Sequence, residues 1–252
     1  MITDPVFYAL AVPAILLVGI SKGGFGGGLA MLAVPMLSLA IDPITAAAIM
    51  LPILCAMDVV GLWAYRKTWD GAILKLIVPA AIVGIVLGAL TFRYMSAPLI
   101  QIIIGLISVL FTLDYVRKRM GGNPEPRSPS TISGGFWSAV SGFTSFVAHA
   151  GSPPLSIYLL PLRLNKTIYV GTTVIFYAVV NYVKLIPYGL LGQFSGANLT
   201  SSLILLPLAP LGTYLGVRLH HKISEPLFYG ICYVALFVIG VRLIYVGVAA
   251  YL

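Results

Sequence analysis

Two interruptions of apolar sequence decide how this chain folds: Ser21-Lys22-Gly23-Gly24-Phe25-Gly26-Gly27-Gly28 and Ala148-His149-Ala150-Gly151-Ser152-Pro153-Pro154. The first divides an apolar stretch over residues 5–41, and the second divides one over residues 132–162. In a bilayer, broken backbone at membrane depth is tolerated only where protein buries it or a wet cavity touches it. Two broken segments in corresponding positions of two halves therefore indicate the binding site of a transporter.

The composition indicates an all-α polytopic membrane protein whose surroundings are the lipid bilayer. Of 252 residues, 60% are hydrophobic and only 9% are charged, whereas a soluble domain carries roughly a quarter charged residues. The apolar runs are continuous, which favours helices over the alternating strands of a barrel. The net charge of +8 lies mostly in short loops between apolar stretches, so we expect no nucleic-acid partner.

The chain carries no recognisable apparatus for catalysis. Cys55 and Cys232 both fall within apolar stretches, too few for a disulfide framework or a metal cluster. No Ser/His/Asp order, metal-ligand spacing or nucleotide motif is present, so we expect no enzyme, no metal and no cofactor.

The apolar stretches predict two similar halves. Residues 5–20 and 29–41 are each too short to cross a bilayer, as are residues 155–162, so each broken segment is interpreted as a pair of half-length helices. Each half then adds three full spans, predicted over residues 44–65, 72–92 and 99–116, and over 168–191, 197–219 and 227–252. Residues 120–131 are polar and rich in proline, which predicts a cytoplasmic linker between a first repeat (1–119) and a second (132–252).

Residue spacing supports a duplication. Three pairs lie 123 residues apart: Gly19 and Gly142, Asp42 and Asn165, and Asp58 and Asn181. Later pairs lie 128 residues apart, among them Pro79 and Pro207, Gly84 and Gly212, Gly88 and Gly216, and Pro98 and Pro226. A loop insertion near residues 191–195 accounts for the change of offset.

The distribution of Lys and Arg selects between two topologies. If each broken segment is a re-entrant hairpin, one face holds ten cationic residues and the opposite loops hold only Arg93; if each segment spans, the split is six against five. The first topology predicts two inverted repeats and a multi-pass protein of the inner (cytoplasmic) membrane with both termini on the non-cytoplasmic side. The ten residues are Arg66, Lys67, Arg117, Lys118, Arg119, Arg127, Arg163, Lys166, Arg218 and Lys222.

The first break has the composition of an anion site. Lys22 lies among glycines, and a lysine at membrane depth is costly and usually functional. The alternative is that it snorkels to the headgroups. The glycines let backbone N–H groups approach a ligand, or else only allow close helix packing, and a helix beginning near Leu29 would direct its N-terminus to the same place. The candidate substrate-binding residues here are Ser21, Lys22, Gly23, Gly24, Gly26, Gly27 and Gly28.

The second break offers matching groups. Ser152 is a suitable N-cap and Pro153 a suitable first helical residue. His149 can bind an anion or relay a proton, and a structural histidine is the equal alternative. The candidate substrate-binding residues in the second half are Ser145, His149, Ala150, Gly151, Ser152, Thr172 and Asn181.

Three residues are candidates for carrying a coupling proton: Asp58, His149 and Lys184. Asp58 lies inside a span and can instead pair with Lys22 or make a buried hydrogen bond. Lys184 lies one helical turn after Asn181, or else near a membrane face. Arg242 lies deep in the last span, and its role is left open.

Several motifs resemble the sulfite exporter TauE/SafE family, also called the TSUP permeases. The glycine-rich stretch 21–28 is similar to the first signature of that family. His149-Ala150-Gly151-Ser152-Pro153-Pro154-Leu155-Ser156 with Tyr158-Leu159-Leu160-Pro161 is similar to the second. Residues 171–176 and 180–184 also resemble it. Many members have a glycine where this chain has Ser152.

The resemblance implies a secondary transporter, a permease that moves small sulfur-containing anions such as sulfite or organosulfonates. Its expected mechanism is alternating access, with H⁺ as the candidate coupling ion. The alternatives are a carrier for another small organic anion and an anion channel. The direction of transport, the identity of the anion and assembly into a homo-oligomer are left open.

Overall fold

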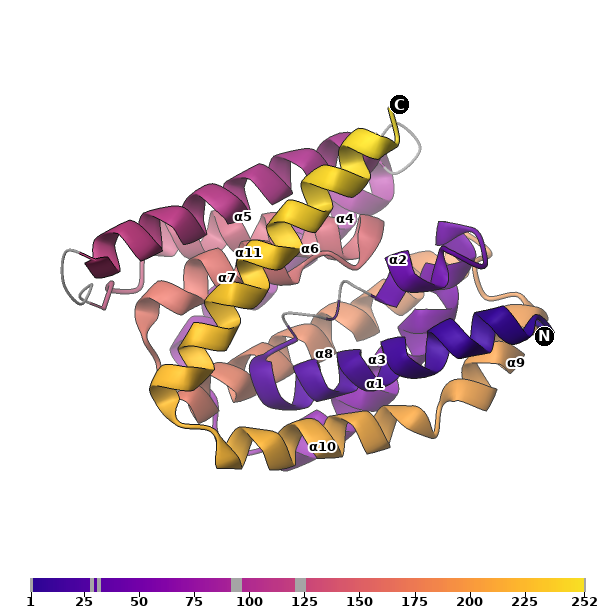
Figure 1. The fold of residues 1–252 in the computed structure, drawn as a ribbon, viewed down its shortest axis with the longest axis horizontal. Helices are drawn as coiled ribbons and strands as arrows, with labels where there is room; N and C mark the ends of the chain where they lie inside the picture. Colours follow the sequence, from indigo (N-terminus) through magenta and orange to yellow (C-terminus); the bar gives the residue numbers. More distant parts are fainter. Residues whose placement is uncertain (1, 28–29, 31–32, 92–96, 121–125, 252) are drawn as a thin grey trace.

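The computed structural model describes residues 2–27, 30, 33–91, 97–120 and 126–251. These residues form helices joined by short connections, without a strand among them, which confirms the all-α prediction (Figure 1). The helices are α1 (Pro5–Phe25), α2 (Ala33–Leu37), α3 (Pro43–Ala64), α4 (Gly71–Thr91), α5 (Ala97–Met120), α6 (Thr131–Ala148), α7 (Ser152–Leu159), the 3-10 turn η3 (Leu160–Leu162), α8 (Lys166–Leu190), α9 (Gly196–Leu205), α10 (Leu208–Lys222) and α11 (Glu225–Ala249).

Five helices in the described ranges are long and apolar enough to cross a bilayer: α1, α3 from Ile44, α4, α8 and α11 from Pro226. Four of them match the spans predicted over residues 44–65, 72–92, 168–191 and 227–252. The span predicted over residues 99–116 forms part of α5, which is not among the five. The protein is therefore a multi-pass helical membrane protein, as its composition predicts.

The prediction that the chain begins with a half-length helix is wrong. α1 has 21 residues, which rise about 31 Å and suffice to cross the hydrocarbon core. The helix continues through Ser21, Lys22, Gly23 and Gly24 because α10 packs against the last turns of α1. Tertiary packing thus overrides the poor helix propensity of glycine.

The span predicted over residues 197–219 corresponds to two helices, α9 and α10, which are long and apolar enough together to form one bent span. α9 ends at Leu205, α10 begins at Leu208, and the two helices are bent by 43° at this break. Pro207 lies at the break, and its missing N–H removes a helical hydrogen bond.

The chain passes through the first broken segment and returns to the end where it started. The Tyr65 hydroxyl donates to the Gly23 carbonyl over 2.6 Å, so α1 and α3 finish at the same end. Near their beginnings, both helices contact adjacent residues of α9: the Ile2 N–H donates to Ser201, and the Ser202 hydroxyl donates to the Ile49 carbonyl. α1 and α3 therefore run in the same direction, with α2 on the return path (Figure 1). This course agrees with the re-entrant alternative.

Each half contributes one helix to two closely packed parallel pairs, α1 with α10 and α4 with α6. A Cβ on Gly19 would lie 2.8 Å from the backbone of Gly212, and one on Gly84 would lie 1.9 Å from the Ala139 carbonyl oxygen. Small residues allow helix backbones to approach in this way. The pairing supports the predicted repeat, and the inversion of the two repeats across the membrane stays a prediction.

Gly84→Ala is expected to lower the stability of the protein by about 1–3 kcal/mol, because the added methyl group meets backbone that has no room to move. Thermal unfolding in detergent measures the change. Gly135→Ala in α6 is the matched control, since a Cβ there meets nothing within 4 Å; it is expected to be neutral or to stabilise by up to about 1 kcal/mol. Equal losses in both variants would contradict the packing described here.

α3 and α8 form the centre of the molecule. In the apolar 18-residue segment of each helix, 67% of α3 and 61% of α8 is buried, a larger share than in the other three candidate spans. They cross in opposite directions, since Asp58 meets Asn181 and Gly61 meets Val174. Any polar group on their shared face is consequently shielded from lipid and from water.

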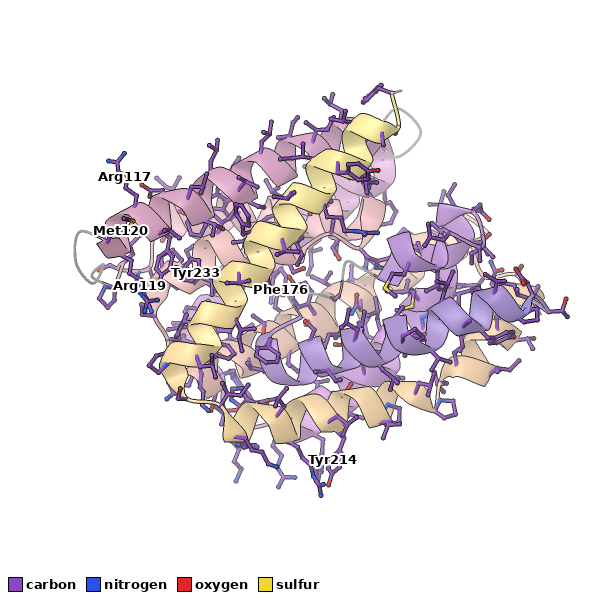
Figure 2. All side chains as sticks on the ribbon, viewed as in Figure 1. Arg117, Arg119, Met120, Phe176, Tyr214 and Tyr233 are labelled. Carbon is purple, nitrogen blue, oxygen red and sulfur yellow. The ribbon has the colours of Figure 1, made fainter. Side chains whose placement is uncertain are left out.

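Several of the cationic residues predicted to share one face gather at one end of the structure. Arg163 donates to the Tyr115 hydroxyl over 2.9 Å and Arg119 donates to it over 3.3 Å, while Lys166 donates to the His220 carbonyl over 2.9 Å. Arg117 and Arg119 extend from the end of α5, whereas Tyr214 extends from α10 (Figure 2). This grouping agrees with the charge argument, and the assignment of this end to the cytoplasm stays a prediction.

Candidate functional site

The two broken segments end their first helices in the same way. After α1, Gly26 has φ +67°, and the Gly27 N–H donates to the Ser21 carbonyl over 2.9 Å. After α6, His149 has φ +50°, and the Ala150 N–H donates to the Thr144 carbonyl over 3.1 Å. The offset of 123 residues relates Gly26 to His149, Gly27 to Ala150 and Ser21 to Thr144. The repeat found in the sequence therefore extends to the backbone of the breaks.

The breaks meet at a cavity with a volume of about 20 Å³, which is room for about one water molecule. The structure brings six of the candidate substrate-binding residues to its wall, from both halves of the chain. The lining residues are Lys22, Gly27, Ala30, Leu54, Ser145, His149, Ser152, Tyr177 and Asn181.

Lys22 is held at the cavity by a buried ion pair. Its Nζ lies 2.6 Å from Oδ1 of Asp58, and the two side chains are 6% and 0% exposed. The Asn181 amide donates to Oδ2 of Asp58 over 2.7 Å. The alternative that Lys22 snorkels to the headgroups is therefore wrong in this structure, because its ammonium points inward to a carboxylate. Asp58 and Asn181, which are related by the repeat, join the two central helices at the cavity.

A second lysine lies behind the part of the wall formed by Ser145 and His149. Nζ of Lys184 lies 3.1 Å from the Ser145 hydroxyl, 3.2 Å from the Ser145 carbonyl oxygen and 2.9 Å from Nδ1 of His149. Nε2 of His149 lies 3.2 Å from the Ala47 carbonyl oxygen. Lys184 is fully buried, so the alternative that it lies near a membrane face is also wrong in this structure. These contacts link the break after α6 to α3 and α8.

The other candidate residues are not among those that line the cavity. Gly23 and Gly24 face α10, where an added Cβ would meet Thr213 and Gly216. This placement favours the packing alternative for these two glycines. Four further candidates are buried residues of the breaks: Ser21, Gly26, Ala150 and Gly151. Thr172 instead accepts a hydrogen bond from the Asp70 N–H over 2.9 Å. Gly28 lies outside the described residues.

The helices that follow the breaks differ from the prediction. α2 covers only Ala33–Leu37, instead of a helix over residues 29–41, so it supplies little dipole at the site. Ser152 is the first residue of α7 and not its N-cap, which is Gly151. Ser152 nevertheless lines the cavity, so the beginning of α7 is the helix N-terminus at this site.

Leu54, Tyr177 and Ala30 line the cavity without having been predicted. Leu54 lies one helical turn before Asp58, and Tyr177 lies one turn before Asn181. The two are also 123 residues apart, so the repeat offset combined with helical spacing would have found them. Arg242 is half-buried in α11, and its Nε has no hydrogen-bond partner within the described ranges.

The whole sequence was compared with models of known protein families, and the result agrees with a transporter site at the paired breaks. The model of the family described as "Sulfite exporter TauE/SafE" matches residues 11–243. The chain belongs to the sulfite exporter TauE/SafE family. Searches of curated proteins and of solved structures give no match. The match covers both halves of the chain, including both breaks and both central helices, and it makes this protein a member of a family of membrane transporters.

Proposed function

We propose that the protein is a secondary transporter that carries a small sulfur-containing anion, such as sulfite or an organosulfonate, through the cavity between the two breaks. One observation carries the proposal: among the residues that the structure describes, the cavity and the groups directly behind its wall include two buried lysines, Lys22 and Lys184, but one carboxylate, Asp58. When both lysines are protonated, this buried excess of positive charge is costly unless a counter-charge accompanies it. An anionic substrate supplies that charge.

The neutral groups at the cavity suit an oxyanion. Ser145, Ser152 and Tyr177 bring hydroxyl groups to the wall, and the first turn of α7 begins there. Hydroxyl groups are ordinary hydrogen-bond donors to sulfate-like and carboxylate anions. Among the first three residues of α7 only Ser152 carries a backbone N–H, because Pro153 and Pro154 have none. The family description names sulfite, and we carry that substrate class over to this chain.

The small size of the cavity supports a carrier over a channel. A volume of about 20 Å³ holds about one water molecule, so an anion enters only when the surrounding helices move apart. A channel needs a continuous wet path. Opening first to one side and then to the other is the alternating access that broken-helix transporters use, here in the inner membrane with both termini outside the cytoplasm.

Anion flux into proteoliposomes tests this function. Wild-type protein is expected to give saturable flux of sulfite and methanesulfonate with counterflow. Lys22→Met is expected to reduce that flux by about 10- to 100-fold, because a charge-assisted contact to the anion is lost. Lys75→Met is the matched control, since Lys75 is an exposed lysine of α4, and wild-type flux is expected.

Three results would overturn the proposal or part of it. The first is the absence of flux for every sulfur anion tested, which would remove the substrate class. The second is Lys22→Met with wild-type flux, which would move the binding site away from the breaks. Single-channel currents in planar bilayers would replace the carrier by a channel.

A further inference from the structure

Lys184 differs from Lys22 in the partners that surround it. Lys22 faces the carboxylate of Asp58, whereas Lys184 Nζ contacts the hydroxyl and carbonyl oxygens of Ser145 and Nδ1 of His149. These partners carry no negative charge. Ser145 and His149 line the cavity, and Lys184 does not. Lys184 is therefore separated from the contents of the cavity by a single layer of hydrogen-bonding groups.

The contacts of Lys184 fit two protonation states without movement of any heavy atom. The Ala47 carbonyl only accepts, so Nε2 of His149 carries a hydrogen and Nδ1 accepts. A charged Lys184 donates one hydrogen to each of its three partners. A neutral Lys184 donates to the Ser145 carbonyl and to His149, and its lone pair accepts the hydrogen of the Ser145 hydroxyl.

The Ser145 hydroxyl connects this proton to the cavity. When Lys184 is neutral, the Ser145 hydrogen points to Lys184, and only oxygen lone pairs face the cavity, where they repel an anion. When Lys184 is charged, the hydroxyl accepts from the ammonium, and its own hydrogen becomes available to donate to an anion. Protonation of Lys184 thus converts Ser145 into a hydrogen-bond donor for the substrate.

The charge balance of the site links the same two events. The pair of Lys22 and Asp58 is neutral. With Lys184 neutral and the cavity empty, the site holds no net charge, and the same is true with Lys184 charged and one monovalent anion bound. Either event alone leaves an uncompensated charge inside the membrane, which is costly. The two neutral forms are therefore the ones that can change between the inward-open and outward-open states.

We infer that Lys184 binds the proton that crosses the membrane together with the anion, and that Ser145 couples the two. The inference rests on the proposed function and adds the proton site to it. The titratable groups acting on Lys184 are Lys22 from α1, Cys55 and Asp58 from α3, and His149 after α6. His149 is the nearest. It cannot hold a second hydrogen while Lys184 is charged, because the Nδ1–H group and the ammonium would then be two donors facing each other over 2.9 Å. The amine is the stronger base in water and takes the proton.

Calorimetry of anion binding in buffers of different ionisation enthalpy counts the protons taken up. Methanesulfonate is the probe, because it is singly charged and does not titrate near neutral pH; sulfite is measured in parallel with its own protonation subtracted. Wild-type protein is expected to take up about one proton per anion, and its affinity is expected to fall about tenfold per unit rise in pH on the alkaline side. In Lys184→Met the proton uptake and the pH dependence are expected to disappear, while Lys75→Met behaves as wild type.

Ser145→Ala provides a second variant that keeps Lys184. It is expected to bind methanesulfonate about tenfold more weakly, because the donor to the anion is lost. Anion binding by wild type without proton uptake would overturn the inference even if Lys184→Met fails to fold, and so would unchanged proton uptake in Lys184→Met. Wild-type protein that neither binds nor transports either anion would overturn the proposed function and the inference with it, a result distinct from proton-independent binding.

Discussion

Asp58→Ala is expected to lower the free energy of unfolding by about 3–5 kcal/mol, the cost of leaving one member of a buried ion pair without its partner. In this variant the Lys22 ammonium, whose side chain is 6% exposed, loses the carboxylate 2.6 Å away. The Asn181 amide loses its acceptor as well. Thermal and denaturant unfolding in detergent measure the loss, and anion flux is expected to be abolished.

A double-mutant cycle separates the effect of the buried charges from the effect of the side-chain volumes. Lys22→Met combined with Asp58→Leu replaces the pair by apolar side chains of similar volume, and such replacements are often neutral or stabilising. The double variant is therefore expected to be more stable than either single variant, Lys22→Met or Asp58→Leu, while remaining inactive in transport. Losses that simply add across the two sites would contradict a direct interaction between Lys22 and Asp58.

Gly26→Ala is the second replacement with a large expected effect. Gly26 has φ +67°, where an alanine costs roughly 1–2 kcal/mol. A Cβ there would also lie 2.7 Å from Oγ1 of Thr173 and 2.9 Å from the Tyr169 ring, which adds an overpacking cost of about 1–3 kcal/mol. Because Gly26 ends α1 four residues after Lys22, the strain is expected to reduce flux as well as thermal stability.

Gly192→Ala is the matched control for the backbone term. Gly192 follows α8 with the same φ of +67°, and a Cβ there meets nothing within 4 Å. Gly192→Ala is expected to show only the backbone cost and wild-type flux. If both variants lose the same stability, the close contact between the first break and α8 is wrong.

The fold class and four of the spans were predictable because apolar composition and helix length are properties of the sequence itself. The pairs Asp42 with Asn165 and Asp58 with Asn181 were also informative. Asp42 and Asn165 are the N-caps of α3 and α8, and Asp58 and Asn181 meet in a hydrogen bond. Equivalent positions of a repeat tend to share one structural role, so spacing alone identified them.

The length of α1 and the contacts of Lys184 depend on packing between helices distant in sequence, whereas the bend at Pro207 has a local cause. α1 continues through Gly23 and Gly24 because α10 covers them, and no local pattern in residues 5–28 contains that information. The partners of Lys184 lie 35 and 39 residues earlier in the chain. Neither helical spacing nor the repeat offset relates Lys184 to Ser145, so only the fold reveals their contact.

An experimental structure with selenite, a heavier analogue of sulfite, tests the central claim most directly. Anomalous scattering locates the selenium without ambiguity. An anion held between the two breaks is expected to give a peak in an enlarged cavity within hydrogen-bond reach of Lys22, Ser145 and Ser152, and to give none there in Lys22→Met. A selenium peak elsewhere in the membrane region, or an unchanged peak in Lys22→Met, would contradict the assignment of the substrate site to the paired breaks.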